Sequence, residues 1–249
     1  MPGQRDILPE VMRDKWVVDL IMEDKEMSFN IAVDGPAGAG KSTIAKQVAK
    51  KLGLIYVDTG AMYRAMALYM VRMGIDVEDE ERVIENCKNA DITIKYEDGV
   101  QVVYLNGENV NAHLRKEEVS NAASKVSVIG PVRAQLVALQ KKLAASSDCI
   151  MDGRDIGTCV LPDADAKIFL TASSAVRAKR RYDELTAKGE QCDLAKIQAD
   201  IEERDYRDMN RENSPLKQAE DAVFVDSSYM TIEEVVDTIT RIAEKKRKG

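Results

Sequence analysis

The stretch DGPAGAGKST, residues 34–43, carries the clearest chemistry in the sequence. Gly35, Gly40, Lys41 and Ser42 match the pattern G-x-x-x-x-G-K-[ST], which predicts a loop whose backbone N–H groups surround phosphate oxygens. The ammonium of Lys41 is expected to reach the β- and γ-phosphates of a nucleoside triphosphate, and the Ser42 hydroxyl to ligate Mg²⁺. The residues predicted to bind this phosphate donor are Gly35, Pro36, Ala37, Gly38, Ala39, Gly40, Lys41, Ser42 and Thr43.

Arginines elsewhere in the chain predict a second anion site. Arg64 follows one apolar run in DTGAMYR, and Arg154 follows another in MDGRD. Planar guanidinium groups suit the recognition of phosphate. Further arginines recur at helical spacing, for which a solvated charged face is the alternative interpretation; these are Arg177 with Arg181, and Arg204 with Arg207 and Arg211.

The remaining polar residues indicate which kind of acceptor this second site takes. Asp152 closes an apolar run and is the candidate carboxylate that orients Mg²⁺, directly or through water; a turn or helix-capping aspartate is the alternative. The chain contains only one histidine, so it has little to offer as a general base. A phosphate monoester is mostly dianionic at neutral pH and needs no base, whereas a hydroxyl acceptor usually needs a carboxylate. The sequence therefore favours a phosphate acceptor.

Short apolar runs and helical patterns alternate around these residues and predict the framework. Helix-like segments at 41–52 and 61–73 stop at Gly53 and Gly74, where C-terminal caps belong. The apolar runs predict strands buried on both faces of a parallel sheet, at 30–34, 54–58, 148–152, 166–170 and 222–226. We therefore predict an α/β fold of the P-loop NTPase type, with an open parallel five-stranded sheet flanked by helices. Ligands bind beyond the carboxyl ends of such strands, where four of the runs end in Asp34, Asp58, Asp152 and Asp226.

Two stretches interrupt this alternation. Residues 90–111 alternate apolar and polar side chains between glycine-containing turns, which predicts a small antiparallel β insert. Residues 172–187 and 194–212 predict two helices joined by a polar tip, an arrangement that can serve as a lid. We expect one domain over 29–249 that carries both additions.

Composition excludes several classes of protein. The net charge of −7 gives no overall attraction to nucleic acid or to an anionic membrane. No apolar run approaches the roughly 20 residues that a membrane-spanning helix needs. The four cysteines form no CxxC pair, which indicates a reducing cytoplasm. Residues 1–28 predict a charged N-terminal extension, poorly ordered or loosely docked, and Met27 is a candidate internal start.

Over about residues 29–235 the chain resembles the bacterial cytidylate kinases, within the nucleoside monophosphate kinase group. The resemblance is carried by IAVDGPAGAGKST, YVDTGAMYRA, NAASKVS, PVRAQLVALQ, MDGRDIGTCVLPDADAKIFLTAS, RAKRR and ERDYRDMNRENSPL. It implies ATP as the phosphate donor, Mg²⁺, a monophosphate-binding insert at about 87–113, a lid at about 177–211 and a monomer.

The resemblance also implies roles for individual residues. Ser124, Arg133 and Asp155 match positions that read the cytosine edge, which offers one amino donor and two acceptors. The monophosphate pocket corresponds to Thr59, Arg64 and Arg154, and the contacts to the acceptor's sugar and phosphate correspond to Arg204 and Asp208. The lid arginines that close on the transferring phosphate correspond to Arg177, Arg181, Arg207 and Arg211. Lys41, Asp152, Arg154, Arg181 and Arg207 are the expected catalytic residues, and Ser42 and Asp152 the expected metal residues.

The sequence thus predicts a cytoplasmic kinase that transfers a phosphoryl group from ATP to CMP or dCMP, without a nucleic-acid or membrane partner. A related P-loop kinase acting on UMP, or on another small phosphate or hydroxyl acceptor, is the alternative. A nucleotide-dependent regulatory protein without turnover is a third interpretation, which the absence of a guanine-reading NKxD motif and the clustered arginines disfavour.

Overall fold

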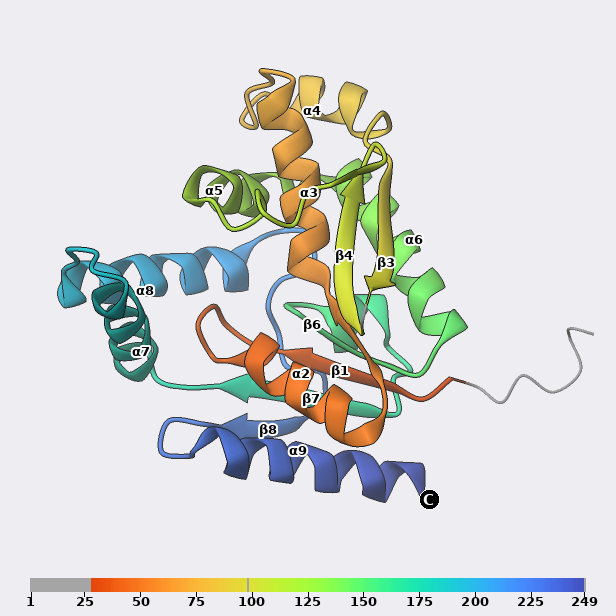
Figure 1. Cartoon of the computed structure of the whole chain (residues 1–249), viewed down its shortest axis with the longest axis vertical. Coiled ribbons are helices and arrows are strands. Elements are labelled where there is room, and N and C mark those ends of the chain that lie inside the picture. Colours follow the sequence, from red (N-terminus) through yellow and green to blue (C-terminus); the bar gives the residue numbers. More distant parts are fainter. Residues whose placement is uncertain (1–27, 98, 249) are drawn as a thin grey trace, which may run out of the picture.

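A five-stranded parallel sheet lies at the centre of the molecule in the computed structural model, which describes residues 28–97 and 99–248. Its spatial order is β2-β6-β1-β7-β8, and Figure 1 labels the last four of these strands. The strands are β1 (Asn30–Asp34), β2 (Ile55–Asp58), β6 (Cys149–Gly153), β7 (Ala166–Thr171) and β8 (Val223–Asp226). All pair in parallel, and the five predicted strands are confirmed to within one residue at each end.

Helices cover both faces of this sheet. On one face, α2 (Lys41–Leu52) and α9 (Ile232–Arg247) pack on the alternate strand residues that include Ile31, Ile168 and Leu170. On the other face, α6 (Gly130–Ser146) and the π-helical turn η1 (Ile156–Val160) pack on Ala32, Val57 and Met151. Because both faces are covered, the strands are apolar on both sides, as expected for a parallel sheet.

A second hydrophobic core lies above the first in Figure 1. It is built by α3 (Thr59–Arg72), α4 (Glu80–Cys87) and α5 (Glu117–Val126) together with α6, and Met62, Met66 and Met70 of α3 are fully buried in it. The helix α3 begins at the carboxyl end of β2, where Asp58 caps it by accepting the Ala61 N–H. This second core therefore places α3 and α5 beside the edge of the sheet where ligands are expected.

The predicted antiparallel insert is confirmed as a three-stranded sheet. It consists of β3 (Ile92–Glu97), β4 (Val100–Leu105) and the short β5 (Glu108–Asn109). Asn106 and Gly107 join β4 to β5 with positive φ values of 50° and 83°, as the predicted turn requires. Of the turn predicted at Asp98 and Gly99, Gly99 has a φ of 75° and Asp98 lies outside the described residues.

The insert is attached to the outer edge of β2. The Gln101 side chain accepts a hydrogen bond from the Asp58 N–H at 2.7 Å and donates to the Asp58 carbonyl at 3.2 Å. The Tyr96 hydroxyl donates to the Tyr56 carbonyl at 3.0 Å. These side chains satisfy three of the backbone groups of β2 that face away from β6.

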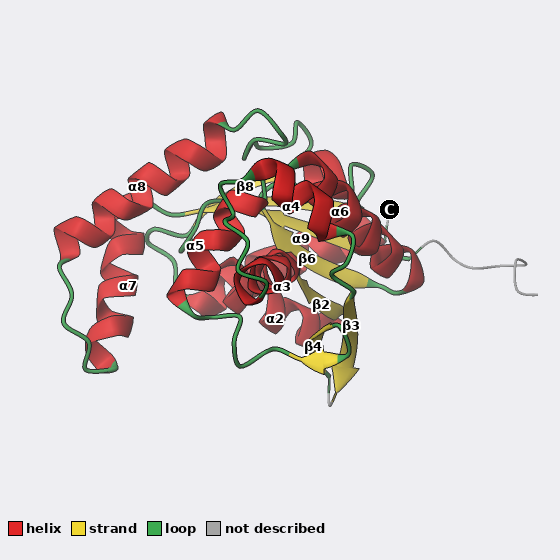
Figure 2. Cartoon of the chain, turned by 90° about the horizontal axis from the view of Figure 1, so that it is seen from above, coloured by secondary structure: helices red, strands yellow, loops and turns green. Residues whose placement is uncertain are grey.

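The predicted helix pair is α7 (Ser174–Ala187) and α8 (Leu194–Asn210), which pack on each other and stand apart from the central sheet in Figure 2. The helix α8 ends at Asn210, two residues before the predicted end, because Arg211 has extended backbone at φ −66° and ψ 142°. Arg211 therefore does not share a helical face with Arg204 and Arg207.

The remaining sequence predictions on the fold have mixed outcomes. The helix over 41–52 is confirmed, and Gly53 caps it in the left-handed region at φ 71°. The expected N-terminal extension lies outside the described residues, except for Ser28. No helix among residues 28–97 and 99–248 is long and apolar enough to cross a membrane.

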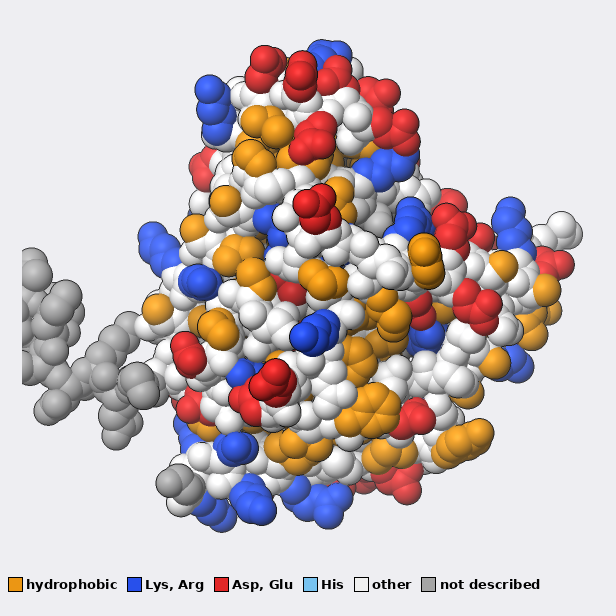
Figure 3. All heavy atoms as spheres, turned by 180° about the vertical axis from the view of Figure 1, so that it is seen from behind, with side chains coloured by type: hydrophobic (Ala, Val, Ile, Leu, Met, Phe, Trp, Pro, Cys, Tyr) orange, Lys and Arg blue, Asp and Glu red, His pale blue; other side chains and the backbone are white. Residues whose placement is uncertain are grey.

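Charged side chains of both signs lie scattered over the face that Figure 3 shows, with acidic ones gathered at the top of the molecule. The helix labelled α4 in Figure 1 lies in this region and contributes Glu80 and Glu81, both exposed.

Candidate active site

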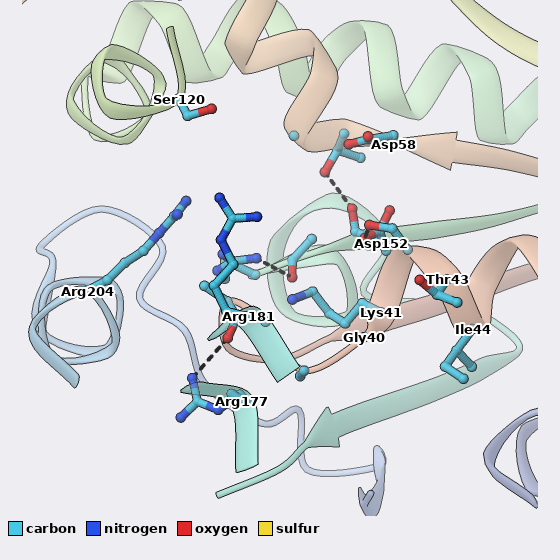
Figure 4. Close-up of a pocket in the computed structure, with 18 of the residues that line it drawn as sticks. Gly40, Lys41, Thr43, Ile44, Asp58, Ser120, Asp152, Arg177, Arg181 and Arg204 are labelled. Carbon is cyan, nitrogen blue, oxygen red and sulfur yellow. Dashed lines mark hydrogen bonds between the residues drawn. The ribbon is translucent and has the colours of Figure 1, made fainter. Parts of the chain in front are cut away.

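A cavity of about 1110 Å³ opens at the carboxyl ends of β1, β2 and β6. The glycine-rich loop 35–40 and the start of α2 form one side of it, and α3, α5 and the arginines of α7 and α8 form the others. Figure 4 shows Lys41, Arg181 and Arg204 pointing into this space, with Asp58 and Asp152 at the ends of their strands. The predicted phosphate loop and the predicted second anion site therefore share one cavity.

The phosphate loop owes its path to glycine. Gly35 has φ 150°, and a Cβ atom there would lie only 1.9 Å from the Leu170 carbonyl oxygen of β7. Gly38 and Gly40 adopt φ values of 74° and 87°, which side chains rarely allow. The loop can therefore curl against the sheet edge and direct its N–H groups inward, at the N-terminus of α2.

Lys41 is buried beneath this loop. Its ammonium donates hydrogen bonds to the carbonyls of Gly35 and Pro36, both at 2.7 Å. Burial, assisted by the positive charge of Arg154, lowers the pKa of Lys41 to about 7. A bound phosphate would stabilise the protonated form, since its negative charge would add to the charges of Asp152, Asp34 and Asp208 that already favour protonation.

Asp152 is buried at the end of β6 and holds three polar groups. One carboxylate oxygen accepts the Ser42 hydroxyl at 2.8 Å and the other accepts the Tyr56 hydroxyl at 2.7 Å. The backbone carbonyl of Asp152 accepts the Thr59 hydroxyl at 2.7 Å. Burial, with the negative charge of Asp58, raises the pKa of Asp152 above its ordinary value.

The oxygens around Ser42 and Asp152 fit Mg²⁺. Mg²⁺ prefers oxygen ligands, keeps several waters and is usually bound by one or two protein groups together with substrate phosphates. No group of three or more His, Cys, Asp or Glu side chains that could hold a metal occurs among the described residues. The donor set therefore suits a metal that arrives with a nucleotide better than a metal held by protein ligands alone.

Asp58, the neighbour of Asp152 in the sheet, positions Arg64. The Arg64 guanidinium donates to the Asp58 carboxylate at 2.9 Å, and both side chains are largely buried. Arg64 also lines the cavity, beside Thr59. Its charge thus lies at the carboxyl end of β2, as the sequence predicted.

Asp155 lies between two arginines at the far end of the cavity. Arg133 donates to it, and Arg211 lies 3.6 Å from its other carboxylate oxygen. All three side chains are at most 8 % exposed, although 22 and 56 residues separate the arginines from Asp155 in the chain. Ser124 of α5 lines the cavity with them. Together these residues offer a carboxylate, a hydroxyl and guanidinium donors around one small volume.

Arg154 and Asp208 form a third buried pair. The Arg154 Nε donates to Asp208 at 2.8 Å. Burial works against ionisation, but the charge and hydrogen bond of Arg154 hold the pKa of Asp208 below its ordinary value. The charge of Arg204 also lowers the pKa of Asp208. Burial, followed by the charge of Arg154, lowers the pKa of Arg204 itself. This crowding of positive charge favours a bound anion.

Comparison with known proteins places the chain in a family. A family model described as "Cytidylate kinase" matches residues 31–245. The chain belongs to the cytidylate kinase family. A cytidylate kinase of Lactobacillus johnsonii is 49% identical over 230 residues, which cover 92% of this chain and 100% of the relative. A cytidylate kinase of Caldicellulosiruptor saccharolyticus is 51% identical over 217 residues, which cover 87% of this chain and 96% of the relative.

Solved structures give a much weaker likeness. The shikimate kinase of Bacteroides thetaiotaomicron aligns with a TM-score of 0.45 and 13% identity, covering 87% of this chain and 98% of that one. Membership of the cytidylate kinase family rests on the sequence matches alone.

Most residues that the sequence predicts for a cytidylate kinase site line the cavity, and a few do not. The exceptions are Gly35 and Pro36, at the start of the phosphate loop, and Arg207, none of which lines the cavity. The Arg207 side chain is 54% exposed and lies 3.7 Å from Glu203. Arg181 lines the outer rim of the cavity, where its guanidinium donates a hydrogen bond to the Glu184 carboxylate at 3.0 Å. In this conformation the two helices therefore hold Arg181 and Arg207 near solvent.

Arg177 differs from the other predicted lid arginines. Its guanidinium donates to the Ala172 carbonyl, to the Ala37 carbonyl of the phosphate loop and to Asp205 of α8, at 2.8, 2.9 and 2.6 Å. It is only 5% exposed. Arg177 thus ties the phosphate loop, α7 and α8 together.

Sequence reasoning missed two parts of this cytidylate kinase site. The first is Tyr56, whose hydroxyl contacts Asp152 although its position inside a strand gave no signal. The second is a wall near α9, lined by Arg180, Ser227, Met230, Thr231, Ile232 and Val235. The polar segment DSSYMT at the carboxyl end of β8 could have indicated this wall, because ligands bind at that edge of the sheet.

Proposed function

We propose that this chain transfers the γ-phosphoryl group of ATP to CMP or dCMP, giving ADP and CDP or dCDP. One observation carries the proposal. The buried Arg133–Asp155–Arg211 cluster and the phosphate loop line the same cavity, so a cytosine nucleotide can bind with its monophosphate facing the triphosphate of the donor. The family membership and the relatives named cytidylate kinase support it.

The donor half of the site is the loop 35–43. Its backbone N–H groups surround the triphosphate, and Lys41 reaches the β- and γ-phosphates. The wall beside α9 then receives the base of ATP, because it continues the cavity beyond Ser42 and Thr43. Mg²⁺ bound by Ser42, with Asp152 beside it, supplies neutralisation of phosphate charge when it is present.

The acceptor half lies between α3, α5 and the turn after β6. Asp155 accepts a hydrogen bond from the cytosine amino group, while Ser124 and Arg133 donate to its acceptor atoms. Thr59, Arg64 and Arg154 bind the monophosphate, and Arg204 and Asp208 contact the phosphate and sugar. An oxygen of the dianionic acceptor phosphate then forms a bond to the γ-phosphorus, and the bond from that phosphorus to the β-phosphate oxygen breaks.

This transfer needs no general base, since the acceptor oxygen carries no proton to remove. The site contributes alignment and positive charge, from Lys41, Arg154, Arg181 and Arg207, against the negative charge of the transferring group. Arg181 and Arg207 reach that group only if α7 and α8 move inward. Such a movement also excludes water, which would otherwise hydrolyse ATP.

We further propose that residues 29–249 form one kinase domain that acts as a monomer in the cytoplasm. The insert contributes to the acceptor side through β2, and α7 with α8 acts as the lid. All four cysteines are free thiols, as a reducing compartment favours.

A coupled ADP-release assay over CMP, dCMP, UMP, AMP, GMP and shikimate tests the proposal. CMP and dCMP are expected to give the highest kcat/KM, and ADP formation without an acceptor to be slow. A preference for UMP or for a hydroxyl acceptor would support the alternative kinase. Nucleotide binding without acceptor-dependent ADP formation would reject the proposal altogether.

A further inference from the structure

Both carboxylate oxygens of Asp152 are held by hydroxyl groups from different elements. Ser42 of α2 donates to one oxygen and Tyr56 of β2 donates to the other, at 2.8 and 2.7 Å. The Ser42 hydroxyl has one proton, so donating it to Asp152 turns its lone pairs in other directions. The orientation of the Asp152 carboxylate therefore decides where the lone pairs of Ser42 point.

Tyr56 is itself fixed in place from several sides. Its ring packs against the core that α2 and α9 form on the sheet, and the Lys46 ammonium lies 5.4 Å from the ring centroid. A hydroxyl on so constrained a ring can set the position of the group that it contacts.

The chemistry of the pair keeps the phenol a donor. Burial, followed by the negative charge of Asp152, raises the pKa of Tyr56 far above its ordinary value. The hydrogen bonds from Tyr56 and Ser42 in turn favour the ionised form of Asp152, against the burial that disfavours it. Tyr56 does not line the cavity, so any effect on bound ligands passes through the groups beside its hydroxyl, Asp152 and Ser42.

We propose that Tyr56 is a positioning residue that fixes the Asp152 carboxylate and, through it, aims the lone pairs of Ser42 at the Mg²⁺ of the bound nucleotide. This inference rests on the proposed function of the site. In this arrangement Asp152 acts on the metal through the orientation of Ser42, whose hydroxyl it accepts.

Tyr56→Phe tests the inference, because it removes one oxygen atom and keeps the ring. Tyr96→Phe is the matched control, since it deletes a neighbouring hydroxyl that bonds to the Tyr56 backbone and leaves the bond to Asp152 intact. Mn²⁺ serves as the probe: electron paramagnetic resonance measures free Mn²⁺ during titration of wild type and both variants saturated with ADP. Calorimetry measures ADP binding without metal, and the kinase assay measures the Mg²⁺ dependence and the KM for CMP.

Tyr56→Phe is expected to weaken Mn²⁺ binding to the ADP complex about 10-fold or more, in the range found for groups that orient metal ligands. The Mg²⁺ concentration for half-maximal rate should rise by a similar factor. Metal-free ADP affinity and the KM for CMP should change less than about twofold, and Tyr96→Phe should match wild type in Mn²⁺ binding.

Unchanged Mn²⁺ binding in Tyr56→Phe would overturn the inference, as would equal weakening in Tyr96→Phe or an equal loss of metal-free ADP affinity. Failure of the proposed function would look different. Wild type would then show no CMP-dependent ADP formation, whatever the behaviour of the Tyr56 variant in the Mn²⁺ titration.

Discussion

The buried carboxylate of Asp34 should make the stability of the chain depend on pH. Asp34 ends β1 and is 4% exposed. Its two oxygens accept the N–H groups of Ile156 and Gly157, both at 2.7 Å, so it joins the phosphate loop to the turn that carries Asp155. Asp34→Asn keeps the shape of this side chain and removes its ionisation.

The magnitude follows from the shift in pKa. Burial is the largest cause that raises the pKa of Asp34, from 3.8 to about 6, with the charge of Asp155 adding to it and the two N–H groups and Lys41 opposing it. The pKa of Asp34 is higher in the folded chain than in the unfolded chain. The stability that protonated Asp34 contributes is therefore fully present below pH 3.8 and is lost as pH rises through about 6. A shift of about 2 units, at about 1.4 kcal/mol each, corresponds to about 3 kcal/mol in total. About 2 kcal/mol of this falls between roughly pH 4.5 and 6.5.

Urea denaturation of the nucleotide-free wild type and Asp34→Asn, at half-unit steps over that window, measures the effect. The wild-type free energy of unfolding should fall by about 2 kcal/mol relative to the variant between the two ends of the window. The window ends below the pKa of Lys41, which is about 7. The lost acceptor for one N–H group shifts the variant's curve by a constant amount. Parallel curves would refute the reasoning.

Three further substitutions follow from the geometry. Asp155→Asn replaces an acceptor beside Arg133 with an amide, so the ratio of kcat/KM for CMP over UMP should fall about 10-fold or more. An unchanged ratio in the coupled assay would contradict the role assigned to Asp155. Gly35→Ala places a Cβ 1.9 Å from the Leu170 carbonyl and should lower ATP affinity strongly in calorimetry, whereas Gly53→Ala, with nothing within 4 Å, should leave that affinity unchanged. Arg177→Met leaves the Asp205 carboxylate buried without its cation, so the free energy of unfolding measured in urea should fall by about 3–5 kcal/mol. A fall of less than about 1 kcal/mol would show that this ion pair does not stabilise the fold.

The local parts of the fold could be predicted from the sequence because short-range physics determines them. Buried strands need continuous apolar runs, and a helix that ends at Gly53 needs a residue that tolerates φ 71°. The phosphate loop is equally local, since all of its residues lie within 35–43. Parallel pairing also requires the strand ends to meet at one edge, which brought Asp58 and Asp152 together as neighbours in the sheet.

The rest depends on contacts between residues that lie far apart in the chain. Asp226 ends a strand like the others, but its carboxylate accepts hydrogen bonds from Ser228 and does not line the cavity, although the next residue, Ser227, does. The path of the chain after β8 decides this, and no pattern in the sequence contains it. Arg177 shares its helical spacing with Arg181, yet one is buried against the phosphate loop and the other is exposed at the rim of the cavity. Spacing places side chains on one face, whereas the depth of each depends on how α7 packs on α8.

The attachment of the insert has a consequence for how copies of this chain can associate. Gln101 and Tyr96 occupy the outward backbone groups of β2 at Tyr56 and Asp58. A strand from a second molecule therefore cannot extend the sheet on that side unless the insert leaves. At the opposite edge no described strand pairs with the outer side of β8, which exposes Val223 and Phe224 over a length of four residues. For the central sheet, intermolecular strand pairing, the usual route from an open sheet to aggregation, is thus confined to one short edge.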